Sequence, residues 1–287
     1  PKKYNNRLNN LLKNIGQVPV LLDSNVIKKN VLRLEQLYKN QGFFDTKVEF
    51  KTELINNNKA NVKYVINTNK QYIIESIKQN IASKDLDSLY QGQISKTQII
   101  KGNPFEIGIF DEERNRLTKF FRNNGVYNFQ QNSIRFTASI DSSGIDNKIP
   151  VTIEISNLQK REKDSMKIIP YRIHKIKRTN LYVDSPGNLG QIPTYTDSII
   201  HNDLMIFSKG KLKYNPKTLE NSIFIKTGSF YSDLARSQTY KYLSNLKNFK
   251  YPSITFSPLN YDSKDLEVLI YLSPKEKFSM GFDFDLS

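Results

Sequence analysis

The sequence predicts an α+β fold built from tandem small modules, in each of which two helices pack on one face of a small sheet. Three observations predict it: an internal repeat, amphipathic helices that stop at a glycine followed within two residues by an aromatic residue, and hairpins whose strands alternate between apolar and polar residues. Such alternation indicates antiparallel strands with one buried face. A complete module would run strand, helix, helix, strand, strand (β-α-α-β-β).

The repeat is clearest at the ends of two helices. Residues 39–44 read KNQGFF, and residues 122–127 read RNNGVY. Glycine is favoured where a helix stops in the left-handed conformation, so we expect Gly42 and Gly125 to be structural residues. When the two glycines are aligned, the apolar residues of each helix form one stripe with the same spacing: Ile27, Leu34, Leu37 and Tyr38 in the first copy, and Phe110, Leu117, Phe120 and Phe121 in the second.

The first module is expected over residues 1–69. It contains a helix near residues 4–14, a second helix that begins at Ser24 with Asp23 or Ser24 as its cap, and a hairpin that turns at residues 56–58. No strand precedes the first of these helices. This copy is therefore interpreted as possibly lacking its first strand.

The second module is expected over residues 70–158. It opens with a strand at residues 71–77 and a short helix at residues 85–90, and the long helix before Gly125 follows. Its hairpin turns through residues 143–144. All five elements of the predicted order are present in this copy.

The third module is expected over residues 159–275. It opens with a strand at residues 168–183, and an insertion at residues 185–217 is expected to form a small extra hairpin. The helix at residues 231–246 has no stop glycine, because Lys247 and Asn248 stand there. A final hairpin ends the module.

The last residues of the chain have their own pattern. Over residues 276–287, large apolar residues alternate with serine, glycine and aspartate, as in a strand of a membrane β-barrel. We expect the start of a barrel-type strand here. The sequence has no initiator methionine and no signal peptide, so we expect it to be a processed or trimmed fragment.

Composition and motifs give little support to an enzyme. The chain has no cysteine and two histidines, His174 and His201, which are far apart in the sequence. Asp283 and Asp285 are better explained as the polar face of a strand, and no phosphate-binding glycine loop is present. We therefore expect no catalytic residue, no metal and no cofactor. An uncharacterised hydrolase stays as a third hypothesis.

A formal charge of +15 permits an anionic partner, so a basic nucleic-acid-binding protein is the alternative from a different class. The basic residues are spread along the chain, and no nucleic-acid-binding motif is present, so we expect no nucleic acid. The densest basic stretch is Arg172, His174, Lys175, Lys177 and Arg178. It either touches acidic clients or anionic lipid headgroups, or protects an edge strand from unwanted pairing, and we favour the second reading.

The repeated unit resembles POTRA (polypeptide-transport-associated) domains of BamA/TamA-type outer-membrane assembly proteins. The motifs that carry the resemblance are residues 38–45 (YKNQGFFD) and 121–127 (FRNNGVY), with residues 242–249 as a weaker third copy. Residues 16–23 (GQVPVLLD) look most like the loop before this helix in TamL, the lipid-anchored TamA relative of Bacteroidota. Residues 273–284 look like the passage from a last POTRA unit into a barrel.

The resemblance implies a periplasmic region of an outer-membrane factor that receives unfolded outer-membrane or secreted polypeptides and passes them to a β-barrel. A BamA-like insertase is the alternative within this class. The resemblance also implies a TamB-like partner that spans the periplasm. Binding would occur by strand addition at the strand after each long helix. The residues expected there are Thr46, Lys47, Glu49, Lys51, Arg135, Thr137, Ser139, Ser253 and Thr255.

Overall fold

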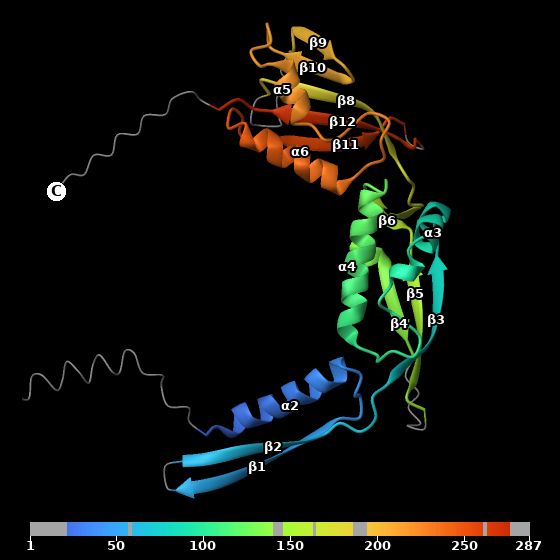
Figure 1. Cartoon of the computed structure of the whole chain (residues 1–287), viewed down its shortest axis with the longest axis vertical. Coiled ribbons are helices and arrows are strands. Elements are labelled where there is room, and N and C mark those ends of the chain that lie inside the picture. The colour runs from blue at the N-terminus through green and yellow to red at the C-terminus, as the bar shows by residue number, and fades with distance from the viewer. Residues whose placement is uncertain are drawn as a thin grey trace, which may run out of the picture. The chain divides into compact units, whose positions relative to one another are not determined.

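The structure is a computed structural model that describes residues 22–56, 59–139, 146–162, 165–185, 194–260 and 263–275. It has the mixed α+β fold with small sheets that the sequence predicts (Figure 1). The described residues divide into two compact units. The first contains those up to Glu75, those of Lys101–Gly108 and those of Ile140–Ile149, and the second contains the rest.

In the described part of the chain, one helix covers the first hairpin. Helix α2 (Ser24–Asn40) runs along the antiparallel strands β1 (Lys47–Asn56) and β2 (Lys59–Asn67) (Figure 1). Asp23 caps α2, because its carboxylate accepts the N–H of Asn25 at 2.7 Å. Among the described residues no third strand pairs with β2. The helix expected at residues 4–14 and the turn at 57–58 lie outside the described residues.

The next sheet contains all the elements expected of a complete module. Its strands β3 (Ile73–Ile81), β4 (Ile134–Ala138) and β5 (Lys148–Ile155) lie in the order β3-β5-β4, with β4 and β5 antiparallel. Helices α3 (Lys84–Gln91) and α4 (Ile107–Asn123) precede β4, and two short 3₁₀ helices lie at Ile94–Lys96 and Gln131–Ser133. The central strand β5 supplies four core residues: Ile149, Val151, Ile153 and Ile155.

The last sheet has five strands in the order β11-β12-β8-β10-β9. Helices α5 (Pro216–Asn221) and α6 (Asp233–Asn245) belong to the same part of the chain. The insertion forms the predicted hairpin, which adds two strands beside β8. The strands are β8 (Lys175–Val183), β9 (Asp197–His201), β10 (Leu204–Ser208), β11 (Ser253–Pro258) and β12 (Asp265–Leu272). The barrel-type strand expected at residues 276–287 lies outside the described residues.

The single strand expected at residues 168–183 is wrong. A separate hairpin of β6 (Leu158–Glu162) and β7 (Ser165–Ile169) precedes β8. Strand β7 ends just before Pro170, which has no N–H to donate to a neighbouring strand. In the segment between β7 and β8, Tyr171 and His174 donate hydrogen bonds to residues outside the sheet that contains β8. The N–H of Tyr171 donates to the hydroxyl of Ser83 at 2.9 Å, and the N–H of His174 donates to the carbonyl of Gly125.

The favoured reading of the basic stretch is also wrong, because β8 is not an edge strand. β12 pairs with it in parallel along one side, and β10 pairs with its second half on the other. Beside its first half, the N–H of Ile176 donates to the carbonyl of Ser229 at 2.8 Å, and the N–H of Gly228 donates back to Ile176. The lysines of β8 therefore do not protect an open edge.

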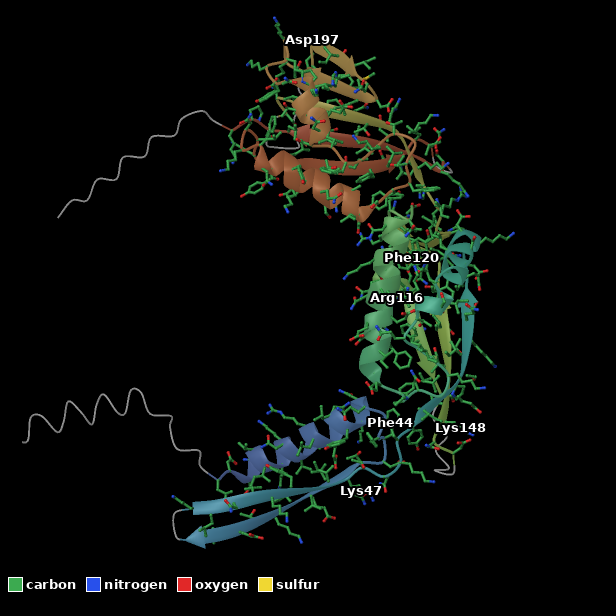
Figure 2. All side chains as sticks on the ribbon, viewed as in Figure 1. Phe44, Lys47, Arg116, Phe120, Lys148 and Asp197 are labelled. Atoms are coloured by element: carbon green, nitrogen blue, oxygen red, sulfur yellow. The ribbon has the colours of Figure 1, made fainter. Side chains whose placement is uncertain are left out.

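In the first unit, Gly42 connects the end of α2 to the segments that follow. Its φ is +86°, the left-handed conformation that ends a helix. Its carbonyl accepts the N–H of Tyr72 at 2.9 Å, and the carbonyl of Tyr72 accepts the N–H of Phe105 at 2.9 Å. The ring of Phe44, between α2 and β1 (Figure 2), packs edge-on against Tyr72 at 5.2 Å and lies 5.7 Å from Phe105.

The second unit repeats this arrangement at Gly125, where φ is +99°. The carbonyl of Gly125 accepts the N–H of His174 at 2.9 Å, and the carbonyl of His174 accepts the N–H of Tyr231 at 3.0 Å. The ring of Tyr127 packs edge-on against His174 at 4.9 Å and Tyr231 at 6.0 Å. In both places the carbonyl of a glycine after a long helix accepts the N–H of the residue just before the next strand. The carbonyl of that residue accepts the N–H of a residue two positions before the next long helix. We call each set a glycine junction.

The junction at Gly42 predicts a large cost for adding one methyl group. A Cβ there would lie 2.5 Å from the carbonyl oxygen of Phe105, a backbone atom, whereas a Cβ at Gly102 (φ +87°) would meet nothing within 4 Å. We expect Gly42→Ala to lower the free energy of unfolding by about 3 kcal/mol, because it adds overpacking to the left-handed penalty. The Gly102→Ala control should cost about 1 kcal/mol. Guanidinium unfolding followed by circular dichroism measures both, and equal costs would contradict the close approach.

Asp85 predicts a pH dependence in the second unit. Its carboxylate accepts the N–H of Ile173 and the ammonium of Lys264, both at 3.0 Å. Burial alone would raise the pKa of Asp85, but these two hydrogen bonds, together with the positive charges of Lys264 and Arg172, outweigh it and hold the pKa below its usual value of 3.8. A lowered pKa in the folded state means that Asp85 stabilises the fold at neutral pH. This contribution is lost as the pH falls below 3.8.

We therefore expect Asp85→Asn to lower the free energy of unfolding by roughly 1–2 kcal/mol at pH 7 and by much less near pH 3. Asp87→Asn is the matched control. Asp87 lies in the same helical turn, but among the described residues its carboxylate bonds only Gln91, within the helix. Thermal unfolding at a series of pH values measures the difference. A cost for Asp85→Asn that does not change with pH would exclude the charged interaction.

Candidate strand-addition site

Strands β1, β4 and β11, each of which follows a long helix, are the outermost strands of their sheets. They contain 10, 5 and 6 residues, so β1 offers by far the longest edge. The residues expected from the sequence lie on or beside these strands: Lys47, Glu49 and Lys51 on β1, Arg135 and Thr137 on β4, Ser253 and Thr255 on β11, with Thr46 just before β1 and Ser139 just after β4. Strand addition uses backbone groups, so their direction decides which residues matter.

On β1 the backbone groups of alternate residues point away from β2. The N–H of Val48 donates to the carboxylate of Glu35 at 3.2 Å, so Val48 does not bond its opposite residue Ile66. In an antiparallel pair the bonded and unbonded positions alternate. The backbone groups of Val48, Phe50 and Thr52 therefore face the open edge, and those of Lys47, Glu49 and Lys51 face β2.

The same alternation holds on the other two edges. The N–H of Ser139 donates to the carbonyl of Pro150, so the odd-numbered residues of β4 bond β5, and Ile134 and Phe136 face outward. The N–H of Leu259 donates to the carbonyl of Asp265, so on β11 Ile254 and Phe256 face outward.

Apart from Thr46, the residues expected from the sequence thus lie on or just beside the edge strands with their backbone groups turned inward. Thr46 is buried, and both its hydroxyl and its N–H donate to the carbonyl of Phe43. The sequence reasoning chose exposed side chains, while availability for pairing depends on backbone direction. That direction follows from the register of the hairpin, and side-chain alternation in one strand does not encode it.

Two of the three edges carry a feature that hinders pairing. On β4, the guanidinium of Arg114 donates to the outward carbonyl of Ile134 at 3.3 Å and lies 5.3 Å from the centre of the Phe136 ring. On β11, Pro258 occupies an outward position, where it has no N–H to offer. Among the described residues, the N–H of Val48, which donates to Glu35, is the only outward backbone group of β1 with a hydrogen-bond partner.

An apolar groove lies beside the open edge of β1. It has a volume of about 640 Å³ and is lined by Lys28, Val31, Leu32, Val48, Glu49 and Phe50. Val31 stands where the aligned repeat has Arg114, so the groove has no arginine at the position from which Arg114 lies over Phe136, although Lys28 and Glu49 are among its lining residues. Phe50 is 42% exposed, Leu32 65% and Leu54 79%. An extended chain that paired with β1 could place alternate apolar side chains here.

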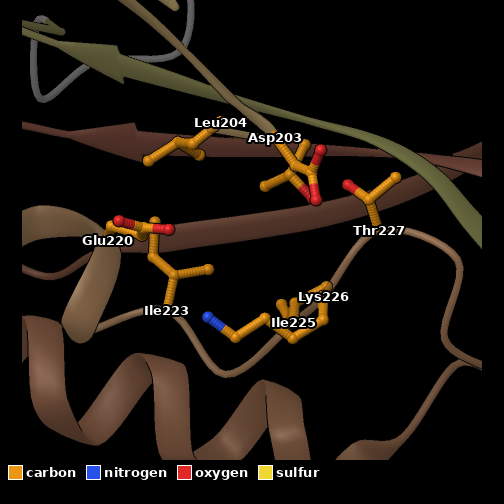
Figure 3. Close-up of a pocket in the computed structure, with 8 residues that line it drawn as sticks. Asp203, Leu204, Glu220, Ile223, Ile225, Lys226 and Thr227 are labelled. Carbon is orange, nitrogen blue, oxygen red and sulfur yellow. The ribbon is translucent and has the colours of Figure 1, made fainter. Parts of the chain in front are cut away.

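A small cavity in the last sheet offers no comparable site (Figure 3). It has a volume of about 50 Å³, enough for water but not for a substrate, and Asp203, Glu220, Lys226 and Thr227 are among its lining residues. Glu220 is already engaged, because it accepts the amide of Asn202 at 2.8 Å and lies 3.1 Å from the imidazole of His201. Across the described part of the chain, no three histidine, aspartate or glutamate residues are grouped as metal ligands.

Within the described ranges, no helix is long and apolar enough to cross a membrane.

Comparison with known proteins finds similar structures only. No family model matches the sequence, and no curated protein matches it. The POTRA3-5 region of Haemophilus influenzae BamA is 12% identical over 86% of this chain and 80% of that one, with a TM-score of 0.39. Anabaena Omp85 POTRA1-3 is 11% identical over 87% and 82%, with a TM-score of 0.29. These values do not assign a family.

A third similar structure is Haemophilus ducreyi BamA lacking POTRA domains 1-3. It is 9% identical and has a TM-score of 0.43, and the match covers 71% of this chain but 30% of that one.

Proposed function

We propose that this chain is the periplasmic POTRA region of an outer-membrane protein assembly or translocation factor. It would bind unfolded outer-membrane or secreted polypeptides by strand addition and pass them to a β-barrel. Residues 1–69, 70–158 and 159–275 would be its three modules. No catalytic residue, cofactor or nucleic acid takes part in this proposal. The repeated glycine junctions support it. Each one joins the end of a long helix to the residues that precede the next strand and the next long helix, as expected for successive modules of the same element order.

The observation that carries the proposal is the open edge of β1. It combines the longest outer strand among the three with an adjacent apolar groove, while Arg114 and Pro258 occupy the equivalent edges. Backbone hydrogen bonds would hold a client largely without regard to its sequence, and the groove would favour clients with alternating apolar residues. Such alternation is what strands of outer-membrane barrels have.

Within this class we propose a TamL-type protein of Bacteroidota, with a BamA-like insertase as the alternative. The support is the sequence of residues 16–23 and the two glycine-aromatic motifs. A TamB-like protein that spans the periplasm would then be the partner, and the same edge of β1 would be available to it. The bacterial outer membrane, periplasmic face, is the proposed location.

Thr52→Pro tests strand addition at β1. The N–H of Thr52 faces the open edge, so proline removes a donor from that edge and leaves the bonds between β1 and β2 intact. We expect the affinity for a fluorescent 10-residue peptide of alternating apolar and polar residues, as long as β1, to fall about tenfold in a fluorescence anisotropy titration. Glu49→Pro is a poor probe, because the N–H of Glu49 bonds β2.

Thr52→Val is the control for this experiment. It changes the same side chain but keeps the backbone N–H, so peptide affinity should change less than twofold. Circular dichroism of both variants checks that the hairpin is intact. Equal affinity of the proline and valine variants would show that the edge of β1 is not used.

Val31→Arg tests the groove separately from the edge. An arginine here reproduces the arrangement of Arg114 over Phe136 and should cover Phe50. We expect affinity for the alternating peptide to fall severalfold, while a peptide with serine at the apolar positions should be unaffected. Lys29→Arg, at an exposed position of α2, is the control for the added guanidinium. Loss of affinity for both peptides would indicate a general effect of charge.

A further inference from the structure

Glu35, on helix α2, closes one end of the open edge of β1. Its carboxylate accepts the N–H of Val48 at 3.2 Å. Val48 is the first residue of β1 whose backbone groups face away from β2, because Lys47 before it faces inward. A polypeptide that adds to this edge must therefore either displace the carboxylate or pair with the outward groups that remain.

The outward residues of β1 do not offer the same number of bonds. They are Val48, Phe50, Thr52 and Leu54, and each presents one N–H and one carbonyl to the same side. Among the described residues, Phe50, Thr52 and Leu54 keep both groups available, whereas Val48 keeps only its carbonyl. An added strand thus finds a complete set of partners from Phe50 to Leu54 and an incomplete one at Val48.

The bond from Val48 to Glu35 is stronger than the bond that would replace it. Hydrogen bonds to a charged acceptor are about twice as strong as those between neutral groups, and the carbonyl of an added strand is a neutral acceptor. Glu35 is also half-buried, so water competes less for its carboxylate than it would on an exposed surface. Displacing the carboxylate is therefore unfavourable.

The second module has a comparable contact at the same end of its edge strand. The guanidinium of Arg114, on α4, donates to the carbonyl of Ile134, the first residue of β4 and an outward one. In both modules a charged side chain of the long helix thus engages the first outward residue of the strand that follows. An acid serves the N–H in one case, and a base serves the carbonyl in the other. This recurrence with opposite charge supports a role for the contact itself.

We propose that Glu35 sets the register of strand addition at β1. It is a positioning residue that holds the added strand to the part of the edge from Phe50 to Leu54. The inference rests on the proposed function, because it concerns where a client pairs at that same edge. It adds the length of the segment that is recognised, about five residues of extended chain.

Glu35→Ala tests the register with two fluorescent peptides of alternating apolar and polar residues. One has 10 residues, as long as β1, and the other has about six, enough to pair from Phe50 to Leu54. The variant frees the N–H of Val48. We expect the affinity of the longer peptide to rise about fivefold in an anisotropy titration, because one more backbone bond can form. The shorter peptide, already fully paired, should change less than about twofold.

Two further variants separate the bond from the charge. Glu35→Gln is the conservative replacement, since its amide oxygen can accept the same N–H, and the gain for the longer peptide should be absent. Glu53→Ala is the matched control, because it makes the same substitution at an exposed residue of β1 whose backbone groups face β2. An equal gain in Glu35→Gln and Glu35→Ala would show that negative charge repels the peptide, and would overturn the proposed role of the bond.

Amide hydrogen exchange followed by NMR reads the register directly. In the unmodified chain, binding of the longer peptide should slow exchange at Phe50 and leave exchange at Val48 unchanged. In Glu35→Ala, exchange at Val48 should be faster without peptide and should slow when the peptide binds. If binding to the unmodified chain slowed Val48 as much as Phe50, the client would have displaced Glu35, and the proposal would be rejected.

This inference and the proposed function fail in different ways. If neither peptide binds any of these variants or the unmodified chain, strand addition at β1 is rejected, and the register with it. If both peptides bind and Thr52→Pro weakens them, while Glu35→Ala leaves both affinities unchanged, strand addition stands and the role of Glu35 is rejected. Binding of the longer peptide to Glu35→Ala alone supports both.

Discussion

The carbonyl oxygen of a left-handed glycine is the constraint on which the arrangement of this chain depends. At Gly42 and again at Gly125 the helix must stop, the backbone must turn, and another segment must approach within contact distance. Any Cβ would oppose the second and third requirements. The glycine carbonyl then accepts the N–H of the residue just before the next strand. The carbonyl of that residue in turn accepts the N–H of a residue near the start of the next long helix. An aromatic ring two residues after each glycine covers these bonds.

The open edge of β1 shows how backbone direction and side-chain protection together decide what a sheet can bind. All three edges after the long helices have the same alternation of inward and outward residues. Arg114 occupies one outward carbonyl, and Pro258 removes one outward donor. On β1, the longest of the three, Glu35 occupies the outward N–H of Val48. Unprotected edges are a liability in soluble proteins, so the remaining length of this edge, beside an apolar groove, is a reason to expect a partner chain.

Among the residues that the structure describes, the first hairpin also has the least complete core. Helix α2 buries one residue, Ile27, whereas α4 buries Phe110, Leu117 and Phe121. The residues of β2 that face the helix are half-buried, while their counterparts on β5 are fully buried. Fewer buried apolar contacts mean a lower local free energy of opening. A strand added to this hairpin would bury further apolar surface.

The sequence alone determined what depends on local spacing. The period-two and helical patterns located the long helices and the hairpins that follow them, and the extra hairpin in the insertion was foreseen, but the β6–β7 hairpin was missed. Of the two residues considered as the first cap, Asp23 is the one that caps α2. Tertiary structure decided what depends on register and on distant partners. Tyr171 and His174 bond residues far along the chain, so a strand expected to pass through them is broken. Which residues of an edge strand face outward follows from how the hairpin pairs, because backbone direction, unlike side-chain polarity, leaves no mark in the sequence.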